Sequence, residues 1–375
     1  METPPVPSPA APRLVALDVL RGFAMLWIVG GDALGGAFAR FDGGAVGRLL
    51  ATQFEHSAWA GFTFYDLIFP LFVFVLGAAI PFSLPRMVAE RGRAAALGRV
   101  GRRTVLLILL GWFCYGGLSG PVSHIRVLGV LQRLAFCYFS ASVLFMFLRP
   151  RDLAAACGAL LGGYWALMTF VSVPGFGAGD LAEGHNLANW FDAQWLPGRK
   201  HDGDHDVEGI LSTLPAVASC LLGVFAGVRL LNPARTAQQK AVELAVAGAA
   251  LLALGWMWHV EFPVIKRLWT SSFVLVAGGW SALLLAGFLY LIDVRRWRTW
   301  ARPFEWVGAN ALAIYLICNL IDFRKVSARL AGGDIAAWLD ARWTGLGGLV
   351  LAFLGVALCV ALCRFLHERK IFLRL

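Results

Sequence analysis

The chain has 375 residues, of which 59% are hydrophobic and 15% are charged, and its formal net charge is +10. A soluble domain is typically about 45–50% apolar and about 25% charged, so this chain has too little polar surface to cover itself in water. The composition therefore excludes an ordinary soluble globular protein and predicts a polytopic membrane protein.

Continuous apolar runs recur along the chain, and a membrane-spanning helix needs about 20 mostly apolar residues. We predict about ten such helices, over residues 14–36, 66–84, 104–119, 125–148, 153–173, 210–231, 241–260, 269–291, 304–322 and 345–365. Strands of a membrane β-barrel alternate apolar and polar residues, and these runs do not. The predicted fold class is therefore all-α.

The distribution of basic residues predicts the orientation of these helices. With the N-terminus placed in the cytoplasm, 20 of the 33 lysines and arginines fall on the cytoplasmic side. The positive-inside rule therefore predicts that both termini are cytoplasmic. The net positive charge follows from these loops, so no nucleic-acid partner is expected.

The remaining composition predicts one domain behind a short tail. Residues 1–12 contain five prolines and are expected to be disordered, and residues 13–375 are expected to form a single transmembrane domain. An alternative is a signal peptide that is cleaved near Ala37–Ala39, but three charged residues interrupt its apolar run. All seven cysteines fall inside predicted spans, so we expect them to pack rather than to form disulfides or bind zinc.

The first predicted helix carries Asp18, Arg21 and Asp32 on one stripe, because Arg21 and Asp32 lie about three turns apart. Charges inside a membrane span are costly, so this stripe is expected to face protein or water. An Asp18–Arg21 pair that only locks helix packing is an equally good interpretation of the inner end. Asp32 lies near the predicted outer end of the helix.

His56 and Asp66 flank the start of the second predicted helix, in "FEHSAWAGFTFYDLIFPLFVFVLG". The topology places both on the outer side, where Asp32 can join them. A carboxylate can orient a neutral imidazole so that it removes a proton from an amine or hydroxyl. His56, Asp66 and Asp32 are therefore the candidate catalytic residues. The alternative is a solvated loop histidine that is covered by Trp59.

Other polar residues are candidates for substrate binding. Arg133 lies inside the fourth predicted span and needs a carboxylate, a phosphate or carbonyls, and Asn310 lies in the ninth, where asparagine often joins helices. The long outer loop over residues 174–209 mixes aromatic and polar residues, as expected of a lid over a sugar. Its Asp and His residues match no metal-binding spacing, so no metal is expected. The binding candidates are Trp59, Arg133, Asn189, Asp192 and Asn310.

Several motifs together resemble the heparan-α-glucosaminide N-acetyltransferase family and its bacterial relatives. They are "RLVALDVLRGFAMLWIV", "HSAWAGFTFYDLIFPLFVFVLGAAI", "GVLQRLAFCYF", "DVEGILSTLPAVASCLLG", "KRLWTSSFVLVAGG" and "FEWVGANALAIYL". They occur in the order of the family and extend over about residues 13–365. Asp32 is a departure, because the family often has asparagine there.

The resemblance implies an enzyme that moves an acetyl group from cytosolic acetyl-CoA to an amino sugar across the membrane. It places the catalytic histidine and aspartate at His56 and Asp66, and the arginine of its "LQR" motif at Arg133. Arg21, Arg102 and Arg103 lie on the side expected for the CoA phosphates. It also implies a homodimer in a bacterial inner membrane. A sugar transporter without acyl transfer is the alternative.

Overall fold

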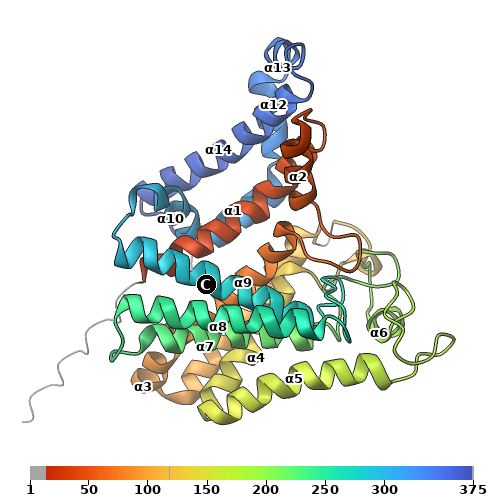
Figure 1. Ribbon diagram of the computed structural model, residues 1–375, viewed down its shortest axis with the longest axis vertical. Coiled ribbons are helices and arrows are strands. Elements are labelled where there is room, and N and C mark those ends of the chain that lie inside the picture. Colours follow the sequence, from red (N-terminus) through yellow and green to blue (C-terminus); the bar gives the residue numbers. More distant parts are fainter. Residues whose placement is uncertain (1–13, 118, 374–375) are drawn as a thin grey trace, which may run out of the picture.

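The computed structural model describes residues 14–117 and 119–373, and over these residues it consists of helices and loops (Figure 1). Isolated β-bridges join loops in four places, but the described residues contain no named strand. The proline-rich tail predicted over residues 1–12 lies outside the described residues.

The helices follow one another in a long series with few short interruptions. They are α1 (Val15–Phe38), α2 (Gly44–Phe54), α3 (Phe64–Cys114), η1 (Val122–His124), α4 (Val130–Phe147), α5 (Pro150–Phe170), α6 (Leu187–Trp195), α7 (Thr213–Leu231), α8 (Ala237–Trp258), α9 (Ser271–Leu289), η2 (Tyr290–Val294), η3 (Thr299–Ala301), α10 (Arg302–Ala309), α11 (Ala311–Leu320), α12 (Phe323–Ala331), α13 (Asp334–Asp340) and α14 (Leu346–Glu368).

Each predicted span contains a helix, and the all-α membrane fold is confirmed. Within the described residues, seven helices are long and apolar enough to cross a bilayer. One of them, α3, has 51 residues and bends at Gly92 (φ 80°, ψ 165°), so it contains the second predicted span and the third as far as Cys114. The ninth predicted span is broken at Asn310 into α10 and α11. The number of crossings and the cytoplasmic termini remain predictions.

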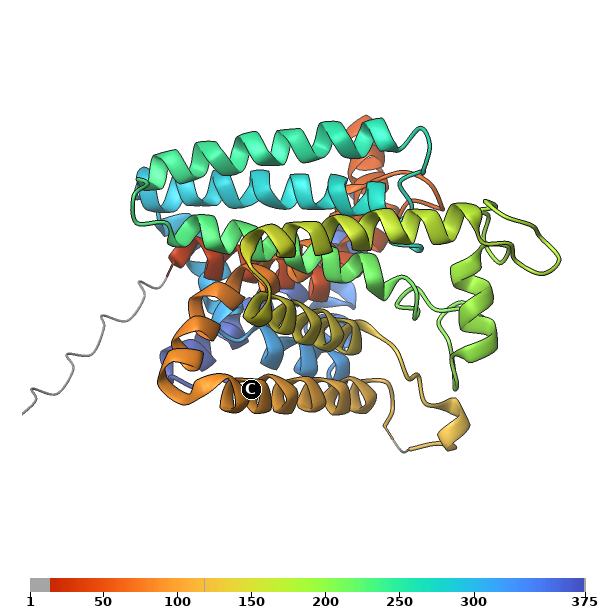
Figure 2. The same ribbon diagram turned by 90° about the horizontal axis from the view of Figure 1, so that it is seen from below.

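Most spans run side by side, and the two ends of the bundle differ (Figures 1 and 2). The long connections, including α6, gather at the end on the right of both views. The Gly92 bend of α3 and the short α7–α8 connection lie at the opposite end. Helices α12 and α13 project from the bundle beside α2 (Figure 1). The loops with His56 and residues 174–209 therefore share one end, as the topology predicted.

Close packing through glycine holds the centre of the bundle together. A Cβ atom added at Gly223 of α7 would lie 1.9 Å from the carbonyl oxygen of Phe74, and one at Gly77 of α3 would lie 1.9 Å from that of Cys220. Helices in a membrane have no hydrophobic drive to associate, so small residues that let backbones approach supply the packing energy. The α3–α7 contact fixes the helix that carries Asp66.

We expect Gly223→Val to lower the free energy of unfolding by about 1–3 kcal/mol, because the new side chain forces α7 away from α3. The measurement is thermal unfolding in detergent micelles. Gly98→Val in α3 is the control, since a Cβ atom there meets nothing within 4 Å. Equal melting temperatures for the two variants would contradict a tight α3–α7 contact.

Candidate active site

The site is built around the buried carboxylate of Asp66, at the start of α3. Thr63 is the N-cap residue, and Thr63 and Asp66 form a reciprocal capping box. Asp66 Oδ2 accepts hydrogen bonds from the backbone N–H of Ser57 (3.2 Å) and of Thr63 (3.1 Å). It also accepts from the hydroxyls of Ser57 (2.8 Å) and Thr63 (3.2 Å). These donors and the helix N-terminus together stabilise the ionised carboxylate.

The other carboxylate oxygen of Asp66 orients His56. Its Oδ1 atom lies 2.9 Å from Nδ1 of His56, whose side chain is 49% exposed while that of Asp66 is fully buried. Nδ1–H donates to the carboxylate, which leaves the lone pair on Nε2. The imidazole also stacks on Tyr65, with ring centroids 4.6 Å apart and planes at 15°. Asp66 and Tyr65 therefore hold His56 in one orientation, with Nε2 as its basic nitrogen.

Asp32 approaches the same place from α1. Gly31 makes this possible, because a Cβ atom there would lie 2.3 Å from the ring of Tyr65. The Tyr65 ring thus lies against α1, and Asp32 interacts with Tyr65 electrostatically. Asp32 itself is exposed. The structure therefore brings the three predicted catalytic residues to one end of α1 and α3.

Lys266 is a member of the site that sequence reasoning missed. Its Nζ atom lies 2.8 Å from Nδ1 and 3.0 Å from Nε2 of His56, and 3.6 Å from Oδ1 of Asp66. Burial lowers the pKa of Lys266, while the charges of Asp66, Glu208 and Asp32 act in the opposite direction. His56 and Lys266 are 210 residues apart. Lys266 is the first residue of the motif "KRLWTSSFVLVAGG", which marks its segment, but its contact with His56 follows only from the spatial neighbourhood of the two loops.

Backbone contacts between two loops bring Lys266 to His56. Ala60 and Ile265 form an antiparallel bridge, and the N–H of Gly61 donates to the carbonyl of Val264 (2.9 Å). The N–H of Ile265 donates to the hydroxyl of Thr270 (3.0 Å), which is the N-cap residue of α9. The loop between α8 and α9 is therefore fixed on both sides of Lys266.

Trp59 joins the His56 loop to the long outer loop. Its Nε1–H donates to the carbonyl of Leu181 (3.0 Å), and its ring packs against the buried cluster that contains Tyr164. The Nε1 edge of the Trp59 indole therefore contacts the protein. Its half-buried ring lies three residues from His56, so its predicted substrate contact stays a prediction.

The outer loop is fastened by a buried ionic network. Arg126 forms a bidentate pair with Asp206 (Nε–Oδ2 2.9 Å, Nη2–Oδ1 2.6 Å) and also donates to Glu208 (2.5 Å). Asp192 accepts from the backbone N–H of Ile210 (2.9 Å) and of Asp206 (3.3 Å). Burial raises the pKa of Asp192 to about 6, although these N–H groups lower it. The network closes the outer end above α4 and α7.

Two of the predicted binding residues help to hold the outer loop in place. Asn189 is buried, and its Oδ1 atom accepts from the N–H of Gly184 (3.0 Å) and the side chain of Asn186 (2.6 Å). Arg133 is buried beneath the loop, where it donates to Ser212 and to the carbonyl of Gly209, and its guanidinium lies 4.8 Å from the ring of Trp269. Neither Asn189 nor Arg133 lines the inner cavity described below.

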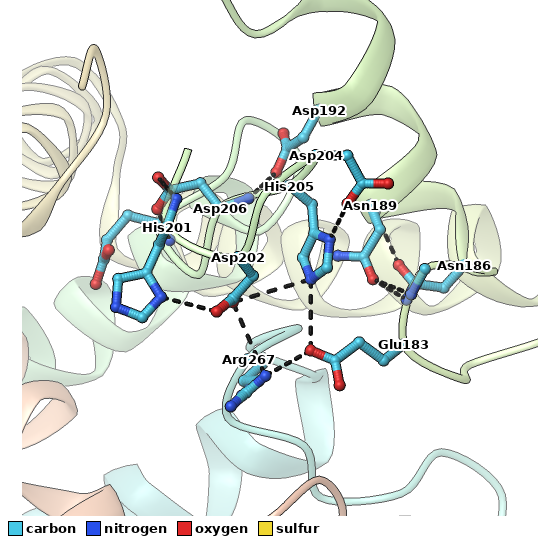
Figure 3. Close-up of polar contacts among 12 residues, drawn as sticks. Glu183, Asn186, Asn189, Asp192, His201, Asp202, Asp204, His205, Asp206 and Arg267 are labelled. Atoms are coloured by element: carbon cyan, nitrogen blue, oxygen red, sulfur yellow. Dashed lines mark hydrogen bonds and ion pairs between the residues drawn. The ribbon is translucent and has the colours of Figure 1, made fainter. Parts of the chain in front are cut away.

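A cluster within this loop has the side chains of a metal site. Ligand atoms of Glu183, Asp202 and His205 all lie within 4.8 Å of one another (Figure 3). However, Nη1 of Arg267 lies 2.5 Å from Glu183 and 3.9 Å from Asp202, so a cation of the chain already compensates part of their negative charge. The expectation that no metal is bound stays a prediction.

A cavity of about 590 Å³ enters the bundle from the opposite end. Apolar residues of α1, α3, α4 and α11 form most of its wall, and Arg21, Arg99 and Arg103 lie at its polar part. Asp18 also lines this part, and it forms the predicted pair with Arg21 (Nη1–Oδ1 3.0 Å). The guanidinium of Arg103 lies 4.5 Å from the ring of Tyr138, and its Nε atom has no hydrogen-bond partner within the described residues. Arg102 does not line the cavity, although Arg99, which was not singled out, does.

The cavity stops short of His56. Its last residues toward the site are Ile28 on α1 and Phe72 on α3. At 1.5 Å per residue these lie about 6 Å below Asp32 and about 9 Å below Asp66. Asn310 is buried at the break between α10 and α11, beside lining residues Ala309 and Ala311, and its amide has no partner within the described residues. One to two helical turns thus separate the two halves of the site.

The fold and the site define a polytopic membrane protein. An oriented histidine lies at one end of its helix bundle, and a cavity lined by arginines at its mouth enters from the other end. A family described as "Domain of unknown function (DUF5009)" matches residues 13–147. Heparan-alpha-glucosaminide N-acetyltransferase of Homo sapiens is 29% identical over 365 residues, which cover 81% of this chain and 52% of that protein. The Mus musculus protein of that name is 28% identical over 367 residues, with 82% and 53% covered.

These similarities confirm the resemblance to the heparan-α-glucosaminide N-acetyltransferase family that the motifs indicated. The chain spans about half the length of the curated relatives it matches. The matched domain, over residues 13–147, contains α1, α3 and α4 and therefore includes Asp32, His56 and Asp66.

We expect Asp66→Ala to lower the free energy of unfolding by about 1–3 kcal/mol, because buried donors of Ser57 and Thr63 lose their acceptor. Thermal unfolding in detergent micelles measures the change. His56→Ala is the comparison, and its half-exposed ring should cost less than about 1 kcal/mol. Equal losses for the two variants would mean that Asp66 does not anchor the loop.

Proposed function

We propose that the protein is a membrane-embedded acyltransferase that moves an acetyl group from cytoplasmic acetyl-CoA to an amino sugar of the glucosamine type. Transfer takes place on the periplasmic side of a bacterial inner membrane, and the protein is proposed to work as a homodimer. The observation that carries the proposal is the pairing of His56 with the buried carboxylate of Asp66, at the end of the bundle opposite the basic mouth of the cavity.

The cavity suits the donor in size and in charge. Small-molecule sites usually have about 300–1,000 Å³ and mostly apolar walls, and this cavity of about 590 Å³ lies in that range. The pantetheine arm of acetyl-CoA is slender, and its other end carries phosphates. Arg99 and Arg103 are placed to hold those phosphates, since guanidinium groups bind phosphate through paired hydrogen bonds. Arg21 is proposed to join them from its ion pair with Asp18. The acetyl thioester then points along α1 and α3 toward His56, and the one to two helical turns between the cavity and His56 must open for the transfer.

His56 supplies the proton transfer that acetylation of an amine requires. Nε2 accepts a proton from the acceptor amine as nitrogen attacks the thioester carbonyl, and Asp66 stabilises the imidazolium that forms. The C–S bond then breaks, and the proton passes to the leaving thiolate. In a two-step route Nε2 itself takes the acetyl group first and then yields it to the amine. Both routes need the same Nδ1–Asp66 hydrogen bond.

The break between α10 and α11 favours one competing function. Interrupted membrane helices with unpaired polar groups at the break are typical of transporters, and the amide of Asn310 fits that description. A transporter would carry an amino sugar across the membrane and release it unmodified. The two functions are distinguished by the chemical state of the sugar that is recovered.

The test of His56 is acetyl transfer by the purified protein from radiolabelled acetyl-CoA to glucosamine. We expect His56→Ala to reduce turnover about 100- to 10,000-fold, the range for loss of a general base. His185→Ala is a matched control, since His185 also lies on the outer side, pairs with a carboxylate (Asp180, 3.2 Å) and stacks on an aromatic ring. Full activity in His56→Ala would refute the assignment. Vesicle uptake of unmodified sugar without acetyl-CoA would support the transporter instead.

The donor mouth is tested with Arg103→Gln. We expect the KM for acetyl-CoA to rise about tenfold or more, because a charge-assisted hydrogen bond contributes about 1.5–3 kcal/mol. The KM for the sugar should stay unchanged. Arg151→Gln is the control, because Arg151 is exposed on the same predicted side and does not line the cavity. Equal KM values for acetyl-CoA in the two variants would remove Arg103 from the donor site.

A further inference from the structure

Lys266 lies closer to the two ring nitrogens of His56 than to the carboxylate of Asp66. The distances are 2.8 and 3.0 Å to the nitrogens and 3.6 Å to the nearest carboxylate oxygen. Asp66 already accepts four hydrogen bonds from Ser57 and Thr63 and pairs with His56. Lys266 is therefore not needed to satisfy Asp66, and the imidazole is its principal contact.

This placement is unfavourable for a purely structural lysine. The Lys266 side chain is 19% exposed, and a buried ammonium loses hydration. Its closest neighbour is an imidazole, which becomes positive whenever it takes up a proton. Groups whose local arrangement opposes stability are found mostly where function requires them. The cost of holding Lys266 here points to a role in the reaction of His56.

The fold gives Lys266 one fixed position. Val264, Ile265, Leu268 and Trp269 of its loop are almost fully buried, and Trp269 adopts a positive φ of 53°. The Ala60–Ile265 bridge fastens this loop to the loop of His56. A catalytic group acts only if its support holds it within a fraction of an ångström of the reacting atoms. The loop between α8 and α9 provides that support.

We propose that the Lys266 ammonium is a catalytic group that stabilises the oxyanion formed when the acetyl carbonyl is attacked beside His56. The inference rests on the proposed function. The amine nitrogen, or Nε2 in the two-step route, forms a bond to the carbonyl carbon, and the C=O π electrons move to oxygen. That oxygen becomes negative next to the ammonium. When the C–S bond breaks, the carbonyl forms again and the thiolate leaves.

Covalent geometry supports this role. A carbonyl carbon bonded to Nε2 places its oxygen about 2.3 Å from that nitrogen. Lys266 Nζ lies 3.0 Å from Nε2, so an oxygen that points to the Lys266 side of the ring comes within hydrogen-bond reach of the ammonium. The ammonium that contacts Nε2 in the resting site can turn to the oxyanion as it forms. A donor placed where charge develops accelerates the step more than it tightens substrate binding.

The test compares Lys266→Met and Lys266→Arg with the wild type. Methionine keeps the length of the side chain and removes the charge, and arginine restores the charge. We expect Lys266→Met to lower kcat about 100-fold or more with little change in either KM, since one oxyanion donor is worth about 100- to 1,000-fold. Lys266→Arg should recover at least a tenth of the lost rate. Arg267→Met, which removes the neighbouring charge, should keep kcat within about threefold.

A second measurement does not depend on acetyl-CoA. The purified variants are treated with p-nitrophenyl acetate, and acetylation at residue 56 is followed by mass spectrometry. This reaction passes through the same kind of oxyanion at Nε2, so Lys266→Met should slow it about tenfold or more if the donor acts. Thermal unfolding must give equal melting temperatures for the variants that are compared.

The outcomes separate the two proposals. If wild type transfers no acetyl group but labelling at residue 56 depends on Lys266, the proposed function fails and the role of Lys266 stands. If transfer occurs and Lys266→Met keeps kcat and the labelling rate, the role of Lys266 is overturned and the function stands. Absence of both transfer and labelling in the wild type overturns the role of Lys266 as well.

Discussion

The buried carboxylate of Asp66 is the interaction on which the rest of the outer site depends. A carboxylate without water needs donors, and Ser57, Thr63 and the first turn of α3 supply them. Because one carboxylate accepts from both ends of the loop, it folds residues 57–63 back over the start of the helix. His56 precedes that loop and is turned toward Oδ1 as a consequence. The same carboxylate therefore caps the helix and orients the imidazole.

The placement of charged groups also determines the structure at the opposite end of the bundle. A membrane helix must satisfy its backbone internally, so charged side chains gather where protein or water meets them. Arg21, Arg99 and Arg103 come from α1 and from the second half of α3, and the Gly92 bend brings these two segments around one cavity. The bend thus joins two predicted spans in one helix and also sets the position of the basic groups. Small residues at the α3–α7 contact keep that geometry fixed.

The sequence carries most of the fold and part of the site. Apolar runs depend only on local composition, so the helices could be predicted, and the ten-residue spacing of His56 and Asp66 at a helix start indicated their pairing. Lys266 could not be predicted, because its contact with His56 depends on a bridge between two loops far apart in the chain. Arg102 and Arg103 are adjacent in the sequence, but only Arg103 faces the cavity, and hydropathy does not report which face of a helix is inward.

Charge balance at the outer site also bears on the acceptor. Asp66 accepts hydrogen bonds from its donors and from His56, so contacts within the protein already compensate most of its negative charge. Asp32 is exposed and lies near Tyr65 and Lys266, so its charge is available to a ligand. An amino sugar arrives as an ammonium ion at neutral pH, and an exposed carboxylate attracts it. The ammonium must first release one proton to solvent, because only the neutral amine can attack a carbonyl. The proposed acetylation therefore uses two kinds of carboxylate: Asp32 draws the acceptor in, and Asp66, buried behind the imidazole, allows His56 to take the second proton as the nitrogen attacks.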